Sequence, residues 1–173
     1  MILPDFEIAR LCNEQNLLDP YNPDLVNPAS IDIRLGETIL TEEEECSEWH
    51  KVNLTKWTKS DPYLLAPGQF ILAESMEIFN VPDFIAGQFA LKSSLARAGF
   101  EHLLAGWIDP GFNGSVLTLE LKNARQLHSI PLWHGMRIGQ IVWHRMAAEP
   151  TVSYKQSGRY NNDATVQSCK GLI

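Results

Sequence analysis

The sequence has no long hydrophobic run and no recognisable leader, and both absences bear on where the protein works. No uninterrupted apolar stretch approaches the roughly 18 residues that a membrane-spanning helix needs. The first ten residues, MILPDFEIAR, lack the basic start and the apolar stretch of a signal peptide. We therefore expect a cytoplasmic protein that has no membrane partner.

Cysteines and basic residues are also scarce. The three cysteines, Cys12, Cys46 and Cys169, are odd in number and far apart, so the sequence indicates neither a disulfide framework nor a Cys-x-x-Cys metal site. The 14 Lys and Arg residues stand against 21 Asp and Glu residues, which gives a formal net charge of −7. Such a chain does not neutralise the many phosphates of a nucleic-acid polymer, although a single nucleotide needs only a few local cations.

The length and composition are those of an ordinary globular domain. The chain has 173 residues, of which 45% are hydrophobic and 20% charged, so it can bury a substantial core. We expect a single domain over residues 1–173. It ends in a flexible tail, about 151–173, whose composition is locally basic. The charged residues of this tail are Lys155, Arg159, Asp163 and Lys170.

Hydrophobic periodicity predicts a mainly β fold with one or two short helices. In the segment SIDIRLG, Ile31, Ile33 and Leu35 alternate with polar residues, which is the period of a half-buried strand. Further strands are expected over 68–82, 83–91, 115–123 and 129–146, the last interrupted at His134–Gly135. Several short strands at this spacing indicate a sandwich or a barrel.

Two segments depart from the strand pattern. Asp5 is a candidate N-cap for a first helix, in which Ile8, Leu11 and Cys12 share one face. Residues 41–62 are rich in acidic and polar side chains, and we expect them to form a solvated excursion from the core.

The segment KSSLARAG gathers polar and basic side chains in a pattern that can bind an anion. It can form a short helix that begins at a serine N-cap and stops at Gly99. The free N–H groups at the helix start, together with the Ser94 hydroxyl and the Lys92 ammonium, then suit a phosphate. A plain capped helix with solvated cations is the alternative that the pattern leaves open.

Two carboxylates are the other candidates for chemistry. Asp109 lies at the centre of the turn GWIDPGFNG, whose small residues let a flat ligand approach the backbone; it can equally cap its own hairpin turn. Glu120 shares a strand face with Val116 and Thr118, and a carboxylate among apolar neighbours can act as a general base. An ordinary exposed strand glutamate explains Glu120 equally well in isolation.

The chain resembles the dCTP deaminase family, whose members are relatives of the trimeric dUTPases. The resemblance covers residues 1 to about 163 and lies in the order and spacing of six segments. The six segments are VNPASIDIRLG, PGQFILA, KSSLARAG, AGWIDPGFNG, LTLELKN and GMRIGQI. The resemblance implies a dUTPase-like distorted β-barrel or jelly roll, also called a β-clip. It also implies a homotrimer whose sites lie between subunits.

The resemblance implies a reaction as well, the hydrolysis of dCTP to dUTP and ammonia, with or without continuation to dUMP and pyrophosphate. Glu120 matches the glutamate that activates water for attack at C4 of cytosine. Ser93 and Arg97 match residues that position this water and stabilise the charge of the glutamate. Mg²⁺ is expected to be bound through the triphosphate. The residues implied to bind the nucleotide are Lys92, Ser94, Gly106, Trp107, Asp109, Tyr154, Arg159 and Tyr160.

The sequence also lacks the zinc motif of the other large class of cytosine deaminases. That class uses an His-x-Glu element followed by Pro-Cys-x-x-Cys, and the chain contains neither. We therefore expect a reaction without zinc that relies on a desolvated carboxylate and preorganised hydrogen bonds. Two alternatives stay open: a dUTP pyrophosphatase in which Asp109 orients water toward the α-phosphate, and a nucleotide-binding relative that does not catalyse.

The spacing of the matched residues departs from the family pattern in two compensating places. The gap from Arg97 to Asp109 is one residue short, and the gap from Gly111 to Glu120 is one residue long. A one-residue slip in a strand would turn Glu120 to the other face, unless a bulge near Gly114–Ser115 absorbs it. The total number of residues from Arg97 to Glu120 is the same as in the family pattern, which favours the bulge.

Some residue types also differ from the family pattern. Lys92 stands where the family usually has arginine, so a point charge replaces a planar bidentate group, and Leu91 replaces a usual glycine. We expect phosphate binding to survive both changes. In the tail, Asn162 and Asp163 stand where a glutamine commonly follows a Lys-Tyr pair. The base that the tail recognises therefore stays open.

Overall fold

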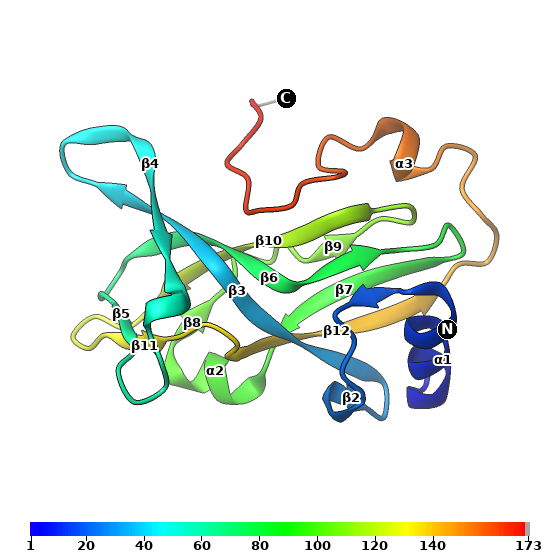
Figure 1. The fold of residues 1–173 in the computed structure, drawn as a ribbon, viewed down its shortest axis with the longest axis horizontal. Helices are drawn as coiled ribbons and strands as arrows, with labels where there is room; N and C mark the ends of the chain where they lie inside the picture. The colour runs from blue at the N-terminus through cyan, green and yellow to red at the C-terminus, as the bar shows by residue number, and fades with distance from the viewer. Residues whose placement is uncertain (172–173) are drawn as a thin grey trace.

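The computed structural model describes residues 1–171, and most of its strands belong to one strongly curled sheet (Figure 1). The central path of this sheet is β8-β10-β6-β3-β12-β7-β9, while β1, β2 and β4 pair beside it and β5 and β11 form a separate pair. The mainly β prediction is confirmed. The strands are β1 Leu18–Asp19, β2 Val26–Asn27, β3 Ser30–Glu43, β4 Cys46–Asn53, β5 Tyr63–Leu65, β6 Phe70–Asn80, β7 Ile85–Leu91, β8 Phe100–Glu101, β9 Trp107–Ile108, β10 Asn113–Asn123, β11 Ile130–Leu132 and β12 Arg137–Arg145.

The helices of the described residues are short, and two expected caps are wrong. Helix α1 has Pro4 in the N-cap position, and Asp5 is its first helical residue. Helix α2 begins at Ser93 after Lys92, without a side-chain cap bond, although Gly99 ends it in a left-handed conformation as expected. The helices are α1 Asp5–Gln15, α2 Ser93–Ala98 and α3 Tyr154–Ser157, with the 3₁₀ turns η1 Pro23–Leu25 and η2 Leu54–Lys56. None of these helices is long and apolar enough to cross a membrane.

Strand β3 lies at the centre of the sheet and is buried more completely than its alternating pattern predicts. Ile31, Ile33 and Leu35 are in the core, at 0–1% exposure. Asp32, expected on a solvated face, is only 2% exposed. Its neighbours explain this burial, because the Lys92 ammonium and the Asn27 amide both donate to Asp32 Oδ1, at 2.7 Å each.

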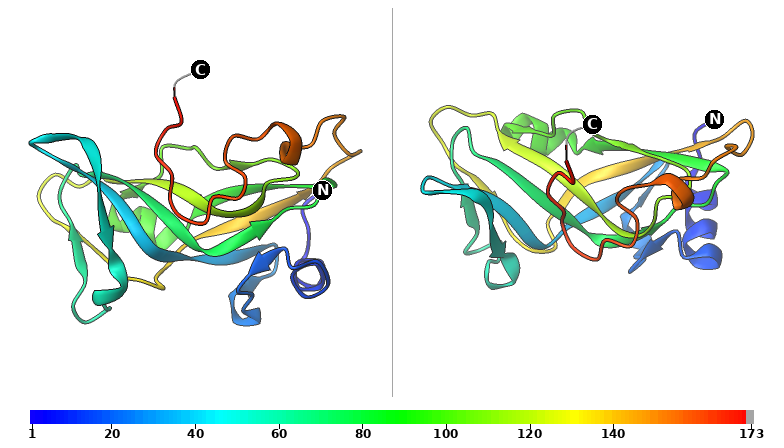
Figure 2. Two further views of the ribbon diagram at one scale, coloured as in Figure 1. Left: turned by 45° about the horizontal axis from the view of Figure 1, so that its top comes forward. Right: turned by 90° about the horizontal axis from the view of Figure 1, so that it is seen from above.

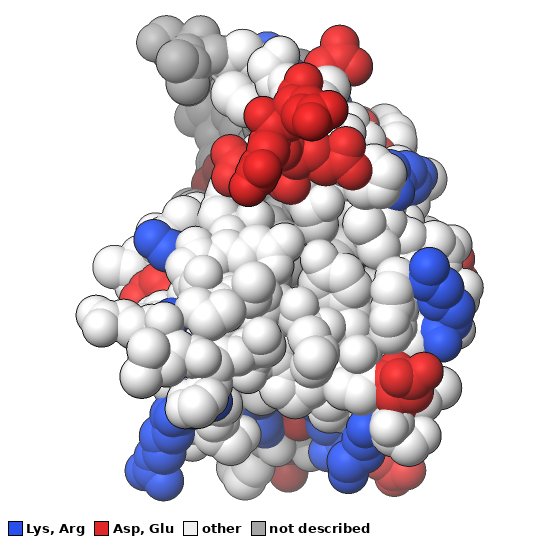
Figure 3. Space-filling view, turned by 90° about the vertical axis from the view of Figure 1, so that its left-hand side faces the viewer, with Lys and Arg blue, Asp and Glu red and all other residues white. Residues whose placement is uncertain are grey.

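The polar segment 41–62 contains a strand that its composition did not predict. Strand β3 continues to Glu43, and β4 returns beside it, so the two form a long hairpin arm. The arm is mostly exposed, as expected. Acidic side chains gather at its tip, where Figure 3 shows a red cluster at the edge of the molecule. Backbone pairing with β3 therefore orders a segment that has no apolar alternation of its own.

The C-terminal segment crosses the concave side of the curled sheet. Figure 2 shows the residues after β12 passing over β10 and β6, with α3 near the turn that follows β9. Helix α2 lies on the opposite side of the sheet in both views. Residues of the tail and of β6 and β10 line a common cleft, and no residue of α2 lines it.

Candidate active site

A cleft of about 510 Å³ lies between β10, the segment 105–112, the hairpin arm and the tail. Its walls are mainly apolar, and a few polar groups face into it. Of the residues proposed from the sequence, the cleft brings together Trp107, Asp109, Glu120, Tyr154 and Tyr160. These residues come from three separate parts of the chain.

Glu120 lies on the wall of the cleft formed by β10. It pairs across the sheet with Leu72 of β6, and Leu72 and Phe70 line the same cleft. Burial among these groups raises the pKa of Glu120 above its ordinary value, because the carboxylate loses hydration. The side chain is therefore a partly desolvated acid rather than the exposed strand glutamate that the sequence also allowed.

A bulge at the start of β10 sets the side of the sheet that Glu120 faces. Asn113 pairs with Asn80, but Ser115, two residues on, pairs with Phe79, the next residue of β6. The bulge predicted near Gly114–Ser115 is thus confirmed. A second irregularity follows between Val116 and Thr118. After both irregularities, the regular pairing resumes with Glu120 on the cleft.

The turn after β9 contributes an exposed aspartate that is hydrogen-bonded to a neighbouring indole. The indole Nε1 of Trp107 donates to Asp109 Oδ1 at 3.1 Å, and both side chains line the cleft. Gly106 lies behind them against β7, where Phe89 N donates to its carbonyl oxygen at 2.7 Å. A Cβ at Gly106 would approach Phe89 O to 2.7 Å. Gly106 thus allows the turn to pack closely on the sheet.

Helix α3 places Tyr154 at one end of the cleft. The Tyr154 ring packs against Phe112 with centroids 5.9 Å apart, and burial raises the pKa of Tyr154. Ser153 caps the helix and donates to Asp83 Oδ1 at 2.5 Å. Gly111 has a φ of +90°, and a Cβ there would lie 2.1 Å from Ser153 Oγ. The position of Tyr154 therefore depends on a residue without a side chain at position 111.

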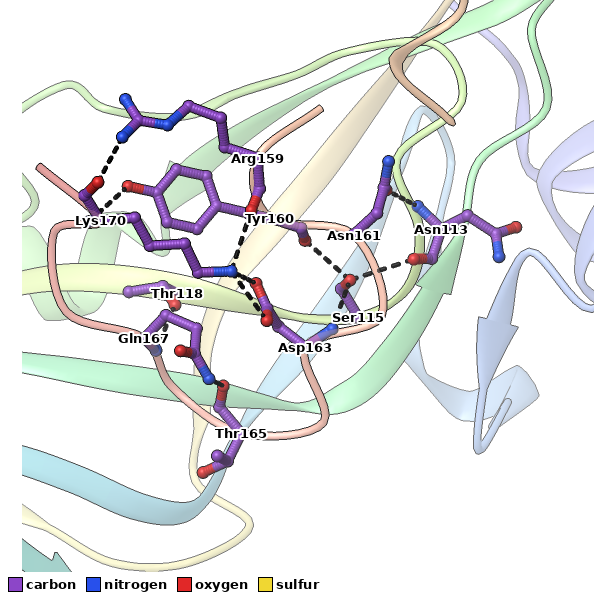
Figure 4. Close-up of polar contacts among 10 residues, drawn as sticks. All are labelled: Asn113, Ser115, Thr118, Arg159, Tyr160, Asn161, Asp163, Thr165, Gln167 and Lys170. Carbon is purple, nitrogen blue, oxygen red and sulfur yellow. Dashed lines mark hydrogen bonds and ion pairs between the residues drawn. The ribbon is translucent and has the colours of Figure 1, made fainter. Parts of the chain in front are cut away.

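Arg159, which was expected to bind the nucleotide, does not line the cleft in this chain. Its guanidinium donates to the backbone oxygen of Lys170 (Figure 4) and also to that of Gly171. The Lys170 ammonium in turn donates to the Asp163 carboxylate at 2.7 and 2.9 Å and lies 4.9 Å from the Tyr160 ring centroid. The tail thus closes on itself at the edge of the cleft.

The four residues proposed on and beside α2 are not in this chain's cleft. Ser93, Ser94 and Arg97 are exposed. The Lys92 ammonium lies 2.7 Å from Asp32 Oδ1. Arg137 of β12 lies 3.7 Å from the other oxygen of Asp32. Within one chain, the structure therefore separates the expected phosphate-binding helix from Glu120.

Sequence reasoning missed two buried carboxylates that organise this region. Asp32 holds Lys92, and Glu74 of β6 accepts hydrogen bonds from the tail at Thr165 and Val166. A signal for Glu74 was present, since it stands in the largely apolar strand FILAESMEIF. In the described residues, no group of three or more His, Cys, Asp or Glu side chains is arranged to hold a metal ion.

Comparison with solved structures shows the fold. The chain superposes on a 2'-deoxycytidine 5'-triphosphate deaminase from Agrobacterium tumefaciens with a TM-score of 0.68 and 22% identity, over 83% of this chain and 47% of that one. It therefore spans about half the length of the Agrobacterium chain. A dUTPase from Streptococcus mutans superposes with a TM-score of 0.51 and 15% identity, over 76% of this chain and 94% of that one. The expected dUTPase-like fold is confirmed.

Sequence comparison shows the family. The chain is 39% identical over 158 residues to an Acidothermus cellulolyticus protein named "dCTP deaminase, dUMP-forming", covering 86% of this chain and 82% of that protein. A Mycobacterium bovis (strain BCG / Pasteur 1173P2) protein of the same name is 36% identical over 189 residues, covering 100% and 98%. A family model described as dCTP deaminase-like matches residues 2–146. The chain belongs to the dCTP deaminase-like family.

Proposed function

We propose that the protein hydrolyses dCTP to dUTP and ammonia and continues to dUMP and pyrophosphate in the same cleft. The observation that carries this proposal is the partly desolvated Glu120 carboxyl on the wall of a cleft of about 510 Å³. That volume lies within the usual range of small-molecule sites, about 300–1,000 Å³. The names of the relatives at 36–39% identity support both the substrate and the product.

The deamination assigns Glu120 the role of general base. The ionised carboxylate takes a proton from water as the water oxygen bonds to C4 of cytosine. The same carboxyl then returns a proton to the 4-amino nitrogen, and the C4–N bond breaks to release ammonia. Burial raises the pKa of Glu120, and a carboxyl with a higher affinity for protons takes one from water more readily.

We propose that α2 of a neighbouring subunit completes each cleft, in a homotrimer. Ser93 and Arg97 then position the water and balance the charge on Glu120, while Lys92 and Ser94 bind the phosphates. Ser93, Ser94 and Arg97 are exposed, and their helix α2 lies on the side of the sheet away from the tail (Figure 2). Both observations support this arrangement. The buried Asp32 holds the Lys92 ammonium in a fixed position at the end of β7.

The remaining site residues are assigned to the sugar, the base and the tail. Asp109, oriented by the Trp107 indole, accepts a hydrogen bond from the deoxyribose 3′-hydroxyl. Gly106 supports this turn. Tyr154 and Tyr160 close the cleft from the tail side, and Arg159 holds the tail in place through the backbone oxygens of Lys170 and Gly171. Mg²⁺ bound through the triphosphate would neutralise part of its charge. Among the described residues, no group of three or more His, Cys, Asp or Glu side chains is arranged to hold a metal.

A dUTP pyrophosphatase is the second candidate. Asp109 lines the same cleft as Glu120, and Trp107 fixes one of its carboxylate oxygens. A carboxylate held in this way can orient a water toward the α-phosphate of dUTP. The two candidates differ in whether the cleft releases ammonia.

The two functions separate in one pair of assays. Purified protein is incubated with dCTP and, separately, with dUTP, and ammonia and pyrophosphate are measured in each. We expect equal amounts of ammonia and pyrophosphate from dCTP. Absence of ammonia from dCTP overturns the deaminase assignment. Pyrophosphate from dUTP together with no ammonia from dCTP supports the second candidate.

A further inference from the structure

A buried carboxylate of β6 holds part of the tail against the sheet. Glu74 of β6 is 7% exposed. Its Oε2 accepts hydrogen bonds from Thr165 Oγ1 and from Val166 N, each at 2.8 Å. A carboxylate that accepts such bonds in a buried site binds its donors more strongly than a neutral acceptor does. The tail is therefore attached by a charge-assisted contact and not only by surface packing.

The other oxygen of Glu74 fixes the side chain in the wall of the barrel. Oε1 accepts from Glu37 N at 3.1 Å and from Thr38 N at 2.9 Å, where β3 leaves its register with β6. Gly36 makes room for this contact, because a Cβ at that position would lie 2.5 Å from Glu74 Cγ. Glu74 thus has a fixed position to which the tail attaches.

An apolar contact accompanies the hydrogen bonds. Val166 is 5% exposed and packs in a small cluster with Leu40 and Leu72, against Trp49 and Phe70. Three members of this cluster, Trp49, Phe70 and Leu72, also line the candidate active site. The attachment point of the tail and the wall of the cleft are therefore one packed unit.

Backbone contacts with β10 continue the attachment along the cleft (Figure 4). Asp163 N donates to Ser115 Oγ at 3.1 Å, and Val116 N donates to Asp163 O at 3.0 Å. Gln167 N donates to Thr118 Oγ1 at 3.3 Å. The side chains of Asp163 and Gln167 line the cleft on either side of the Glu74 contact.

We propose that Glu74 is a positioning residue that holds residues 163–169 as a wall of the nucleotide cleft before any nucleotide binds. This inference rests on the proposed function, since it assigns the wall to the nucleotide. A segment that is already ordered loses little conformational freedom on binding, so the nucleotide binds more tightly. Asp163 and Gln167 depend on Glu74 for their place beside the ligand.

The first test needs no nucleotide. Amide hydrogen exchange is measured across residues 163–169 in the full chain, for the parent and for Glu74→Gln and Thr165→Val. Thr165→Val removes a donor from the tail and leaves the contacts of Glu74 with β3 in place, so it stays informative if Glu74→Gln fails to fold. We expect exchange to accelerate about tenfold or more in Glu74→Gln, and by a smaller factor in Thr165→Val. Unchanged exchange in the folded variants overturns the proposal.

The second test asks whether the attachment serves the nucleotide. We expect Thr165→Val to raise the KM for dCTP about threefold to tenfold and to change kcat less. Thr165→Ser, which restores the hydroxyl, should recover the parent KM. The matched control is Thr151→Val, at an exposed threonine of the same tail. Faster exchange with an unchanged KM contradicts the assigned role. If the parent protein has no activity on dCTP, the proposed function is wrong. The hydrogen-exchange measurement then still tests whether Glu74 holds residues 163–169 in place.

Discussion

Glu120 owes its chemical character to the strand that places it. Its neighbours on the adjacent strand β6, Phe70 and Leu72, are apolar and line the same cleft, and burial raises the pKa of the carboxyl. An exposed glutamate would titrate near about 4.3 and would be a weak base at neutral pH. The raised pKa makes Glu120 a stronger base, and this is what a proton carrier between water and a leaving amine requires.

Replacing Glu120 by glutamine should abolish deamination and spare binding. The amide keeps the size and shape of the carboxyl but cannot accept the proton of water. We expect ammonia release from dCTP to fall by about 10²–10⁴-fold, while the dissociation constant for dCTP changes by no more than about threefold. Glu149→Gln, at an exposed glutamate, is the control. Retained turnover in Glu120→Gln would remove Glu120 from its assigned role.

The same replacement has a pH-dependent effect on stability. The raised pKa of folded Glu120 means that its ionisation opposes folding. This opposition is absent below the ordinary glutamate pKa, about 4.3, and develops as the pH rises through the raised value. We therefore subtract the unfolding midpoint temperature of the parent from that of Glu120→Gln at each pH. This difference should be more positive at about pH 7.5 than at about pH 4. A difference in midpoint temperature that is the same at both pH values would argue against burial as the cause.

Some residue-scale features could be predicted from the sequence and others could not. Glu120 and Asp109 are apparent from their motifs, and both lie in the cleft. Asp32 follows the alternation expected of a solvated face, yet it is buried because Lys92 and Arg137 arrive from β7 and β12. The alternation of apolar and polar residues is a property of one strand. It does not predict which basic side chains of neighbouring strands will contact that strand.

At the scale of elements, the strands with apolar alternation were predictable and the polar elements were not. Strand β10 and its bulge followed from the pattern and from the preserved total spacing between Arg97 and Glu120. Strand β4 is polar and is ordered by pairing with β3. Helix α3 has four residues and is capped by Ser153, which also contacts Asp83, 70 positions earlier. The local sequence pattern cannot predict a contact between residues so far apart in the chain.

The cap of α3 gives a prediction for the element as a whole. Gly111→Ala places a Cβ 2.1 Å from Ser153 Oγ, so α3 must move and Tyr154 must leave its place beside Phe112. We expect weaker dCTP binding, by about tenfold, and a loss of stability beyond the 1–2 kcal/mol or so that a left-handed alanine costs.

The control for Gly111→Ala is Gly68→Ala. Gly68 also has a positive φ, +75°, but nothing lies within 4 Å of a Cβ there. This variant should lose stability through backbone strain alone and keep the parent affinity for dCTP. Both quantities follow from urea unfolding and a nucleotide titration. Equal affinities in the two variants would mean that α3 does not position a nucleotide contact.

At the scale of the whole molecule, one chain supplies only part of the proposed site. The cleft contains Glu120 and Asp109, while α2, the helix that contains Ser93 and Arg97, lies on the opposite side of the sheet (Figure 2). A closed ring of identical subunits brings two different surfaces of the chain together at each interface. The proposed active site is therefore complete only if α2 of one subunit reaches the cleft of the next.

Mixing two inactive variants tests this dependence directly. Glu120→Gln and Arg97→Ala are each expected to release little ammonia from dCTP. If their subunits assemble at random in equal amounts, about a quarter of the clefts combine an intact Glu120 with a neighbour's intact Arg97. A mixture of Glu120→Gln with Asp109→Asn, which alter the same chain's cleft, should regain nothing.

The measurement is ammonia release from dCTP after the two variants are unfolded together and refolded together. The account predicts recovery of about one quarter of the parent rate for the Glu120→Gln and Arg97→Ala pair, and no recovery for the control pair. The contradicting result is a mixture of Glu120→Gln and Arg97→Ala that refolds to trimers and stays as inactive as each variant alone. The site would then not be shared between subunits.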